Sequence, residues 1–152
     1  EKRGYESHDI DGSGFGGPVN LKTGEPTKVS PADQRPPEWF DQHEWRVSRP
    51  AVEKLKHHAK NKLVFLCGTT TTEHLIWDLF DKILYLNIDV ETLKNRIANR
   101  ADNDFGKSPD ELKLILDRYQ KAQAKLPELD VTVIDATRSI DAVIAEILDS
   151  VE

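Results

Sequence analysis

The sequence predicts an α/β fold built on a mainly parallel sheet. Two short apolar runs, at 63–66 and 83–88, are dense in aliphatic and aromatic residues, and each ends in a polar cluster. Such runs are typical of strands that helices cover on both faces. Strand-like and helix-like segments also alternate along the chain, which favours a parallel sheet between two layers of helices. We therefore expect a three-layer α/β sandwich.

Length and composition limit the classes of protein to consider. The 152 residues correspond to one domain, and the formal net charge of −6 argues against a basic nucleic-acid-binding surface. The single cysteine cannot form an internal disulfide, which favours a reducing, cytoplasmic setting. No apolar run approaches the length of a membrane span. We expect one domain over residues 1–152, with neither nucleic acid nor membrane as a partner.

The first expected strand covers residues 5–11 and ends in two carboxylates. Asp9 and Asp11 lie two apart, so in a strand both side chains point to one face, and His8 points to the other. Ligands of parallel sheets bind at the carboxyl ends of the strands. A carboxylate pair there suits a Mg²⁺–water shell or a substrate hydroxyl, with Asp9 as the better candidate for base or metal contact. A solvated strand end is the alternative, and we expect His8 to be structural.

Residues 12–49 are expected to form a flap or acceptor-side insertion. Four glycines lie within 12–17, which invites a phosphate-loop interpretation. A Walker loop, however, requires Gly-x-x-x-x-Gly-Lys-Ser/Thr between a strand and a helix. No Gly-Lys-Ser/Thr follows here, and Pro18 with the polar residues beyond it does not open a helix. Glycine- and proline-rich segments of this length are typical of surface loops that carry function.

The remaining elements follow from apolar periodicity and capping residues. Asp89 is expected to cap one helix, Ser108 a second, with Glu111 three residues on, and Ser139 the last. The expected helices cover 50–60, 73–80, 90–100, 109–125 and 140–150, and the expected strands cover 63–67, 83–88 and 131–134.

Six segments carry a resemblance to a known family. They are Arg-Gly-Tyr-Glu-Ser-His-Asp-Ile-Asp at 3–11, Val-Phe-Leu-Cys-Gly at 64–68, Phe-Asp-Lys-Ile-Leu-Tyr-Leu at 80–86, Arg-Ile-Ala-Asn-Arg at 96–100, Asn-Asp-Phe-Gly-Lys at 103–107 and Val-Ile-Asp-Ala-Thr at 133–137. In this order and spacing they resemble the nucleoside and nucleotide kinase branch of the P-loop NTPases, which includes adenylate kinase-like and shikimate kinase-like proteins. They are closest to bacterial proteins described as AAA-family ATPases or predicted nucleoside kinases.

The chain departs from this family at its start. In the family, a first strand and a Walker loop precede the segment that begins here at Glu1, and that strand lies between the two matching 63–67 and 83–88. The resemblance thus implies a P-loop kinase-like sheet that lacks its first strand in this chain, and hence a truncated, inactive kinase. Direct pairing of 63–67 with 83–88 would refute the expectation of a missing strand.

The resemblance implies roles for several residues. Arg96 and Arg100 match a pair that stacks on the nucleotide base and contacts its phosphates from a lid, here the loop 101–110. Arg118 matches the arginine that returns to the transferring phosphate. Asp135, Ala136 and Thr137 match the loop that holds adenine, with Thr137 or the next residue close to the base. Solvated helix faces and ordinary capping are the alternatives for these residues.

Three further residues are expected on the substrate side. Gly68 closes a strand where a glycine permits close approach of a ligand, Thr69 follows it, and Arg46 could help wall an acceptor pocket. The resemblance implies an ATP- and Mg²⁺-dependent phosphotransferase that acts on a nucleoside, nucleotide or other small hydroxylated acceptor. A non-catalytic nucleotide-binding or interaction module without the phosphate loop is the alternative.

Overall fold

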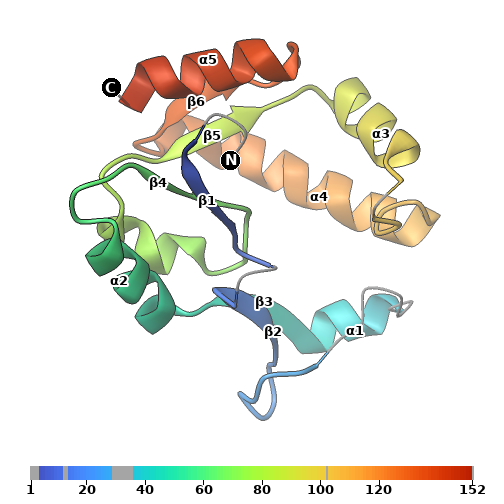
Figure 1. Ribbon diagram of the computed structural model, residues 1–152. Helices are drawn as coiled ribbons and strands as arrows, with labels where there is room; N and C mark the ends of the chain where they lie inside the picture. Colours follow the sequence, from blue (N-terminus) through green and yellow to red (C-terminus); the bar gives the residue numbers. More distant parts are fainter. Residues whose placement is uncertain (1–3, 12–13, 29–35, 102, 152) are drawn as a thin grey trace. The chain divides into compact units, whose positions relative to one another are not determined.

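The computed structural model describes residues 4–11, 14–28, 36–101 and 103–151. It has mixed α/β character, with two parallel strand pairs and one antiparallel pair among these residues (Figure 1). The chain divides into two compact units, Glu1–Asp81 (unit 1) and Lys82–Glu152 (unit 2). Each unit is described by itself. The α/β class and the parallel pairing are confirmed, and the single domain stays a prediction.

The core of unit 1 is built around the parallel strands β1 (Glu6–Asp9) and β4 (Val64–Cys67). Glu6 pairs with Val64 and Asp9 with Cys67, so the carboxyl ends of both strands lie at one edge. Helix α2 (Arg49–His58) and the 3-10 helix η1 (Glu73–Leu79) supply apolar side chains. The buried cluster consists of Ile10, Phe15, Val52 and Ile76.

The segment expected to be a flap contains an antiparallel hairpin, which the sequence analysis did not predict. Strand β2 (Gly16–Asn20) pairs with β3 (His43–Val47), and the short helix α1 (Pro37–Gln42) leads into β3. Local propensity argues against β2, because glycine and proline are both unfavourable in strands. Pro18 has no N–H to donate, but its carbonyl accepts a 2.8 Å hydrogen bond from the Thr27 N–H.

Unit 2 contains the parallel strands β5 (Leu84–Asn87) and β6 (Thr132–Asp135). Its helices are α3 (Val90–Asn99), α4 (Pro109–Lys125), the 3-10 turn η2 (Leu126–Glu128) and α5 (Ile140–Val151). Ile134, Ala136 and Val143 form the buried cluster, with Leu84, Ile88 and Ile147 packed against it. Figure 1 shows β5 beside β6.

The three expected caps, Asp89, Ser108 and Ser139, are confirmed in unit 2. The Asp89 carboxylate accepts a 2.7 Å hydrogen bond from the Thr92 N–H at the start of α3. The Ser108 hydroxyl accepts a longer bond, 3.4 Å, from the Glu111 N–H at the start of α4. These side chains satisfy backbone donors that have no partner within a helix.

Two large apolar side chains in the helical segments are exposed. Leu75 in η1 is 57% exposed and Ile140 at the start of α5 is 75% exposed. The segment at 73–80 was expected to be an α-helix, but it forms a 3-10 helix, which has a different angular spacing of side chains. Ile140 occupies the first turn of α5, one turn before the buried Val143.

Strand pairing bears on the expected missing strand. β4 takes β1 as its partner and β5 takes β6. In the described part of the chain, residues 63–67 do not pair with residues 83–88. Such a direct pairing would have refuted an intervening strand. The intervening strand stays a prediction. None of the described helices combines the length and hydrophobicity that crossing a bilayer requires.

Candidate functional site

The carboxyl ends of β1 and β4 frame a pocket in unit 1. Its volume is about 430 Å³, and its lining consists of Ser7, His8, Asp9, Asp11, Cys67, Gly68 and Thr69. The structure thereby brings together four of the residues that the sequence singled out: Asp9, Asp11, Gly68 and Thr69. They meet where two parallel strands end, as expected for a ligand site on a parallel sheet.

The two carboxylates meet through a turn rather than along a strand, which corrects the sequence-based expectation. β1 ends at Asp9, and the Ile10 N–H donates a 2.8 Å hydrogen bond to the Cys67 carbonyl. The Asp11 N–H then donates to Asp9 Oδ1, also at 2.8 Å. Burial and the nearby Asp9 charge both raise the pKa of the Asp11 carboxyl. The nearby Trp45 side chain opposes this rise in the pKa, and the Asp11 side chain lines the pocket.

Gly68 has a packing reason to be glycine, in addition to its position at the pocket. Its φ is +131°, a conformation that residues with a side chain rarely adopt. A Cβ atom at this position would lie 2.2 Å from Ile10 Cγ2. The space beside Gly68 is therefore filled by the core residue Ile10, and packing against Ile10 explains the glycine without a ligand.

The threonine run after Gly68 fixes the pocket wall. The Thr69 hydroxyl donates a 2.9 Å hydrogen bond to Glu73 Oε2, and the Thr70 N–H donates to the same oxygen at 2.5 Å. Beyond them, the Thr71 hydroxyl donates to the Trp45 carbonyl at 2.9 Å, and the Thr72 hydroxyl accepts from the Val47 N–H at 3.0 Å. Sequence reasoning missed Glu73 as the acceptor that orders this turn. Glu73 follows Thr70 by three residues and Thr69 by four, and this spacing of a carboxylate after hydroxyl-bearing residues could have identified it.

His8 also lines the pocket, although it was expected to point away. Its Nε2 atom lies 2.8 Å from Glu6 Oε1, and its ring packs edge-on against Phe15. The Lys62 ammonium donates to Glu6 Oε2 at 2.8 Å. Hydrogen bonds from Lys62 and His8 lower the pKa of Glu6 to about 2, with a smaller contribution from His58. This cluster ties β1 to the segment after α2.

Cys67 lines this pocket, whereas Arg46 is not among its lining residues. Burial raises the pKa of the Cys67 thiol, which disfavours the nucleophilic thiolate. The Arg46 Nε donates to Glu44 on the same strand. Because side chains alternate along β3, Arg46 and Glu44 lie on the face opposite Trp45.

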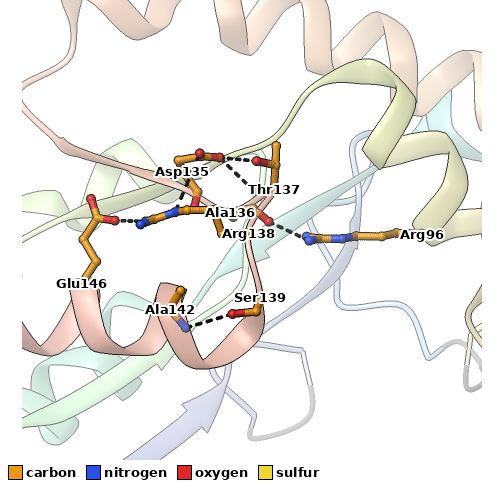
Figure 2. A network of polar contacts seen from close by, with 8 residues as sticks. All are labelled: Arg96, Asp135, Ala136, Thr137, Arg138, Ser139, Ala142 and Glu146. Atoms are coloured by element: carbon orange, nitrogen blue, oxygen red, sulfur yellow. Dashed lines mark hydrogen bonds and ion pairs between the residues drawn. The ribbon is translucent and has the colours of Figure 1, made fainter.

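In unit 2, Arg96 reaches the loop that follows β6. Its Nη2 atom donates a 2.6 Å hydrogen bond to the Ala136 carbonyl (Figure 2). The Thr137 N–H and hydroxyl both donate to Asp135 Oδ1, at 3.0 and 2.7 Å, and these two bonds lower the pKa of the Asp135 carboxyl. Arg96 and the loop 135–137, which the family resemblance links to nucleotide binding, therefore lie together.

The residue after Thr137 is Arg138, which links this loop to α5. Its Nε donates to the Asp135 carbonyl at 3.1 Å, and its Nη2 donates to Glu146 on α5 (Figure 2). The Ser139 hydroxyl accepts a 3.4 Å hydrogen bond from the Ala142 N–H. The loop is thus held from one side by Arg96 and from the other by Arg138.

Arg100 and Arg118 lie elsewhere in unit 2. Arg100 donates to the Asn103 carbonyl at 3.0 Å and to the Phe105 carbonyl, so it braces the described part of the loop 101–110. Asp102 lies outside the described residues. Arg118 is exposed on α4 and makes no hydrogen bond or ion pair with the described residues, while desolvation lowers the pKa of its guanidinium. Within the described residues neither arginine forms an ion pair, although the Arg100 charge contributes to lowering the pKa of the Asp104 carboxyl.

No group of three or more His, Cys, Asp or Glu side chains in the described ranges is arranged to hold a metal ion. Comparison of the chain with protein-family models, with curated proteins and with solved structures finds no match. The resemblance to P-loop kinases therefore stays a prediction from the sequence.

Proposed function

We propose that the complete protein is an ATP-dependent phosphotransferase of the P-loop kinase type, folded as a three-layer α/β sandwich with a mainly parallel sheet, and that the chain without a Walker loop is inactive. Its acceptor is a nucleoside, a nucleotide or another small hydroxylated molecule. The observation that carries this proposal is the pocket in unit 1, where Asp9 and Asp11 share a lining with Gly68 and Thr69 at the carboxyl ends of parallel strands. The single free cysteine fits a cytoplasmic setting.

The carboxylate pair supplies the base for such a reaction. The Asp11 N–H holds one Asp9 oxygen, which orders the pair, and the Asp11 side chain lines the pocket, where its carboxylate can accept a hydrogen bond from an acceptor hydroxyl. In transfer, the hydroxyl proton passes to this carboxylate and the acceptor oxygen bonds to the γ-phosphorus. The bond between that phosphorus and the β–γ bridging oxygen breaks, and ADP leaves with the electron pair. Positioning and charge stabilisation then account for most of the rate.

The donor set fits magnesium that arrives with the nucleotide. Mg²⁺ is usually held by one or two carboxylates together with phosphate oxygens and waters, rather than by a cage of protein ligands. Asp9 is exposed at the pocket, and no larger cluster of ligands lies in the described part of the chain. When bound, Mg²⁺ would neutralise charge on the transferring phosphoryl group.

Unit 2 supplies the residues for the nucleotide in this proposal. Arg96 and the loop 135–137 are joined by the hydrogen bond to Ala136, and this supports a role in holding the base. Arg100 and Arg118 form no ion pair with a carboxylate in the described part of the chain, and guanidinium groups bind phosphate well.

Calorimetric titration with ATP, with and without Mg²⁺, tests the proposal on the chain extended by the strand and Walker loop that the resemblance implies. We expect saturable binding that Mg²⁺ strengthens. Arg96→Ala should weaken it about tenfold or more, as expected for loss of a charge-assisted contact. Lys94→Ala, an exposed cation on the same helix, is the matched control and should leave binding unchanged. Absence of saturable binding would overturn the kinase proposal. Binding without phosphoryl transfer to any hydroxylated acceptor would favour the non-catalytic nucleotide-binding module.

A further inference from the structure

The indole nitrogen of Trp45 is a buried donor without an acceptor. Nε1 is shielded from solvent and has no hydrogen-bond partner among the described residues. Such groups are rare in folded proteins, because the N–H loses its bond to water and gains nothing in exchange. An unpaired buried N–H therefore calls for an explanation in terms of what it faces.

The indole faces the turn that carries Asp11. Gly16 lies beside it: a Cβ atom on Gly16 would lie 3.5 Å from Trp45 Nε1 and 3.4 Å from the Ile10 carbonyl oxygen. The indole edge and the backbone immediately before Asp11 thus meet over a residue that has no side chain. Trp45 is also close enough to the Asp11 carboxylate to oppose the rise in the pKa of that group.

The main chain at Trp45 is fixed to the same pocket wall. The Trp45 carbonyl accepts hydrogen bonds from the Thr71 N–H at 3.0 Å and from the Thr71 hydroxyl at 2.9 Å. Thr71 follows directly on the turn in which Glu73 holds Thr69 and Thr70. Trp45 is therefore anchored at its backbone to Thr71, and its indole edge lies beside Gly16, close to the turn that carries Asp11.

The unpaired donor and the unpaired acceptor complement each other. Among the described residues, no hydrogen bond to the Asp11 carboxylate is found, and Trp45 Nε1 has no acceptor. The other ionisable groups around this pocket are Asp9 and His8 on β1, Cys67 at the end of β4 and Glu73 in η1. Of these, the neighbouring Asp9 carboxylate repels Asp11, so Trp45 is the group that can hold Asp11 in place.

We propose that Trp45 is a positioning residue, whose indole N–H pairs with the Asp11 carboxylate and orients it toward a ligand in the β1–β4 pocket. The proposed pairing would satisfy the donor that the structure leaves without an acceptor, and it requires no ligand. Its value for accepting a proton from an acceptor hydroxyl rests on the proposed function.

The indole N–H signal in NMR spectra at one fixed pH tests the pairing directly. We expect the Trp45 signal to lie downfield and its proton to exchange slowly with solvent. Asp11→Ala should move the signal upfield and accelerate exchange, and Asp11→Asn, which keeps a neutral acceptor, should give an intermediate result. Glu44→Ala removes a neighbouring carboxylate from the opposite face of β3 and should leave the signal unchanged. The Trp39 and Trp77 signals serve as internal references.

An indole signal that Asp11→Ala leaves unchanged would overturn the pairing. This measurement needs neither nucleotide nor acceptor, so it remains decisive if the proposed kinase activity is absent. Where activity is found, Trp45→Phe keeps an aromatic ring but removes the N–H. We expect it to lower kcat about tenfold with KM within about twofold of the original value, the signature of a lost orienting contact. A rise of about tenfold in KM with an unchanged kcat would contradict the positioning role.

Discussion

Arg96 Nη2 donates a 2.6 Å hydrogen bond to the main-chain carbonyl of Ala136. The two residues come from α3 and from the loop after β6, so one guanidinium joins a helix to the carboxyl end of the neighbouring strand. Ala136 is buried, and its N–H donates to the Asn87 carbonyl on the other strand at 2.8 Å. Both polar groups of this residue are therefore satisfied, which fixes the conformation of the loop.

Arg96→Ala should destabilise the protein. A hydrogen bond from a charged donor contributes about 1.5–3 kcal/mol, and because Arg96 is exposed we expect a loss of about 1 kcal/mol. Arg96→Lys keeps the charge but lacks the planar fork, so it should recover part of the loss. Urea unfolding measures the change as a lower midpoint at constant m-value. A midpoint equal to that of Lys94→Ala would contradict the contact.

Gly68→Ala should be severely destabilising. The new methyl group would meet Ile10 Cγ2 at 2.2 Å, and the φ of +131° adds backbone strain. We expect a loss of about 2–4 kcal/mol in the free energy of unfolding, as for overpacking combined with an unfavourable backbone conformation. Gly17→Ala is the matched control, because a Cβ there meets nothing within 4 Å. A similar cost for both variants would show that the contact with Ile10 is not responsible.

Acid should destabilise unit 1 through Glu6. Its pKa is lowered from 4.5 to about 2, so the folded state keeps the carboxylate ionised where the unfolded chain takes up a proton. The stabilisation is present above the unfolded pKa and is lost as the pH falls from 4.5 toward 2. Glu6→Gln should therefore flatten the pH dependence of the urea midpoint across this window. An unchanged slope would exclude the cluster with Lys62 and His8 as its source.

The caps of α3 and α4 should differ in strength. Asp89→Ala removes a 2.7 Å hydrogen bond to the Thr92 N–H and should cost about 1 kcal/mol. Ser108→Ala removes a bond of 3.4 Å and should cost less. Asp89→Asn retains a good cap and is the control. Thermal or urea unfolding compares the three variants, and a larger loss for Ser108→Ala would contradict the geometry.

The elements that the sequence predicted share a local cause. Asp89 and Ser108 act within one helical turn, and the apolar runs that became β4 and β5 are recognisable from a few consecutive residues. The placement of Asp9 at a strand end was also predicted, from the short segment 5–11. Short-range chemistry of this kind can be read from neighbouring residues alone.

The elements that the sequence did not predict depend on distant partners. β2 forms against its local propensity because β3 pairs with it along five residues, from Gly16 with Val47 to Asn20 with His43. The pairing of Thr71 with Trp45 and the approach of Ile10 to Gly68 likewise join residues that are far apart in the sequence. No local pattern specifies these contacts, because packing decides them.

The most direct test of the proposed function is a backbone amide NMR titration of the protein with ATP and Mg²⁺. The account predicts saturable shifts concentrated at Arg96 and at residues 135–138, and further shifts at Asp9, Asp11, Gly68 and Thr69 when a nucleoside acceptor is added. Spectra that do not change up to millimolar ATP, about the weakest affinity expected for a cellular nucleotide site, would contradict the assignment of this protein as an ATP-dependent phosphotransferase.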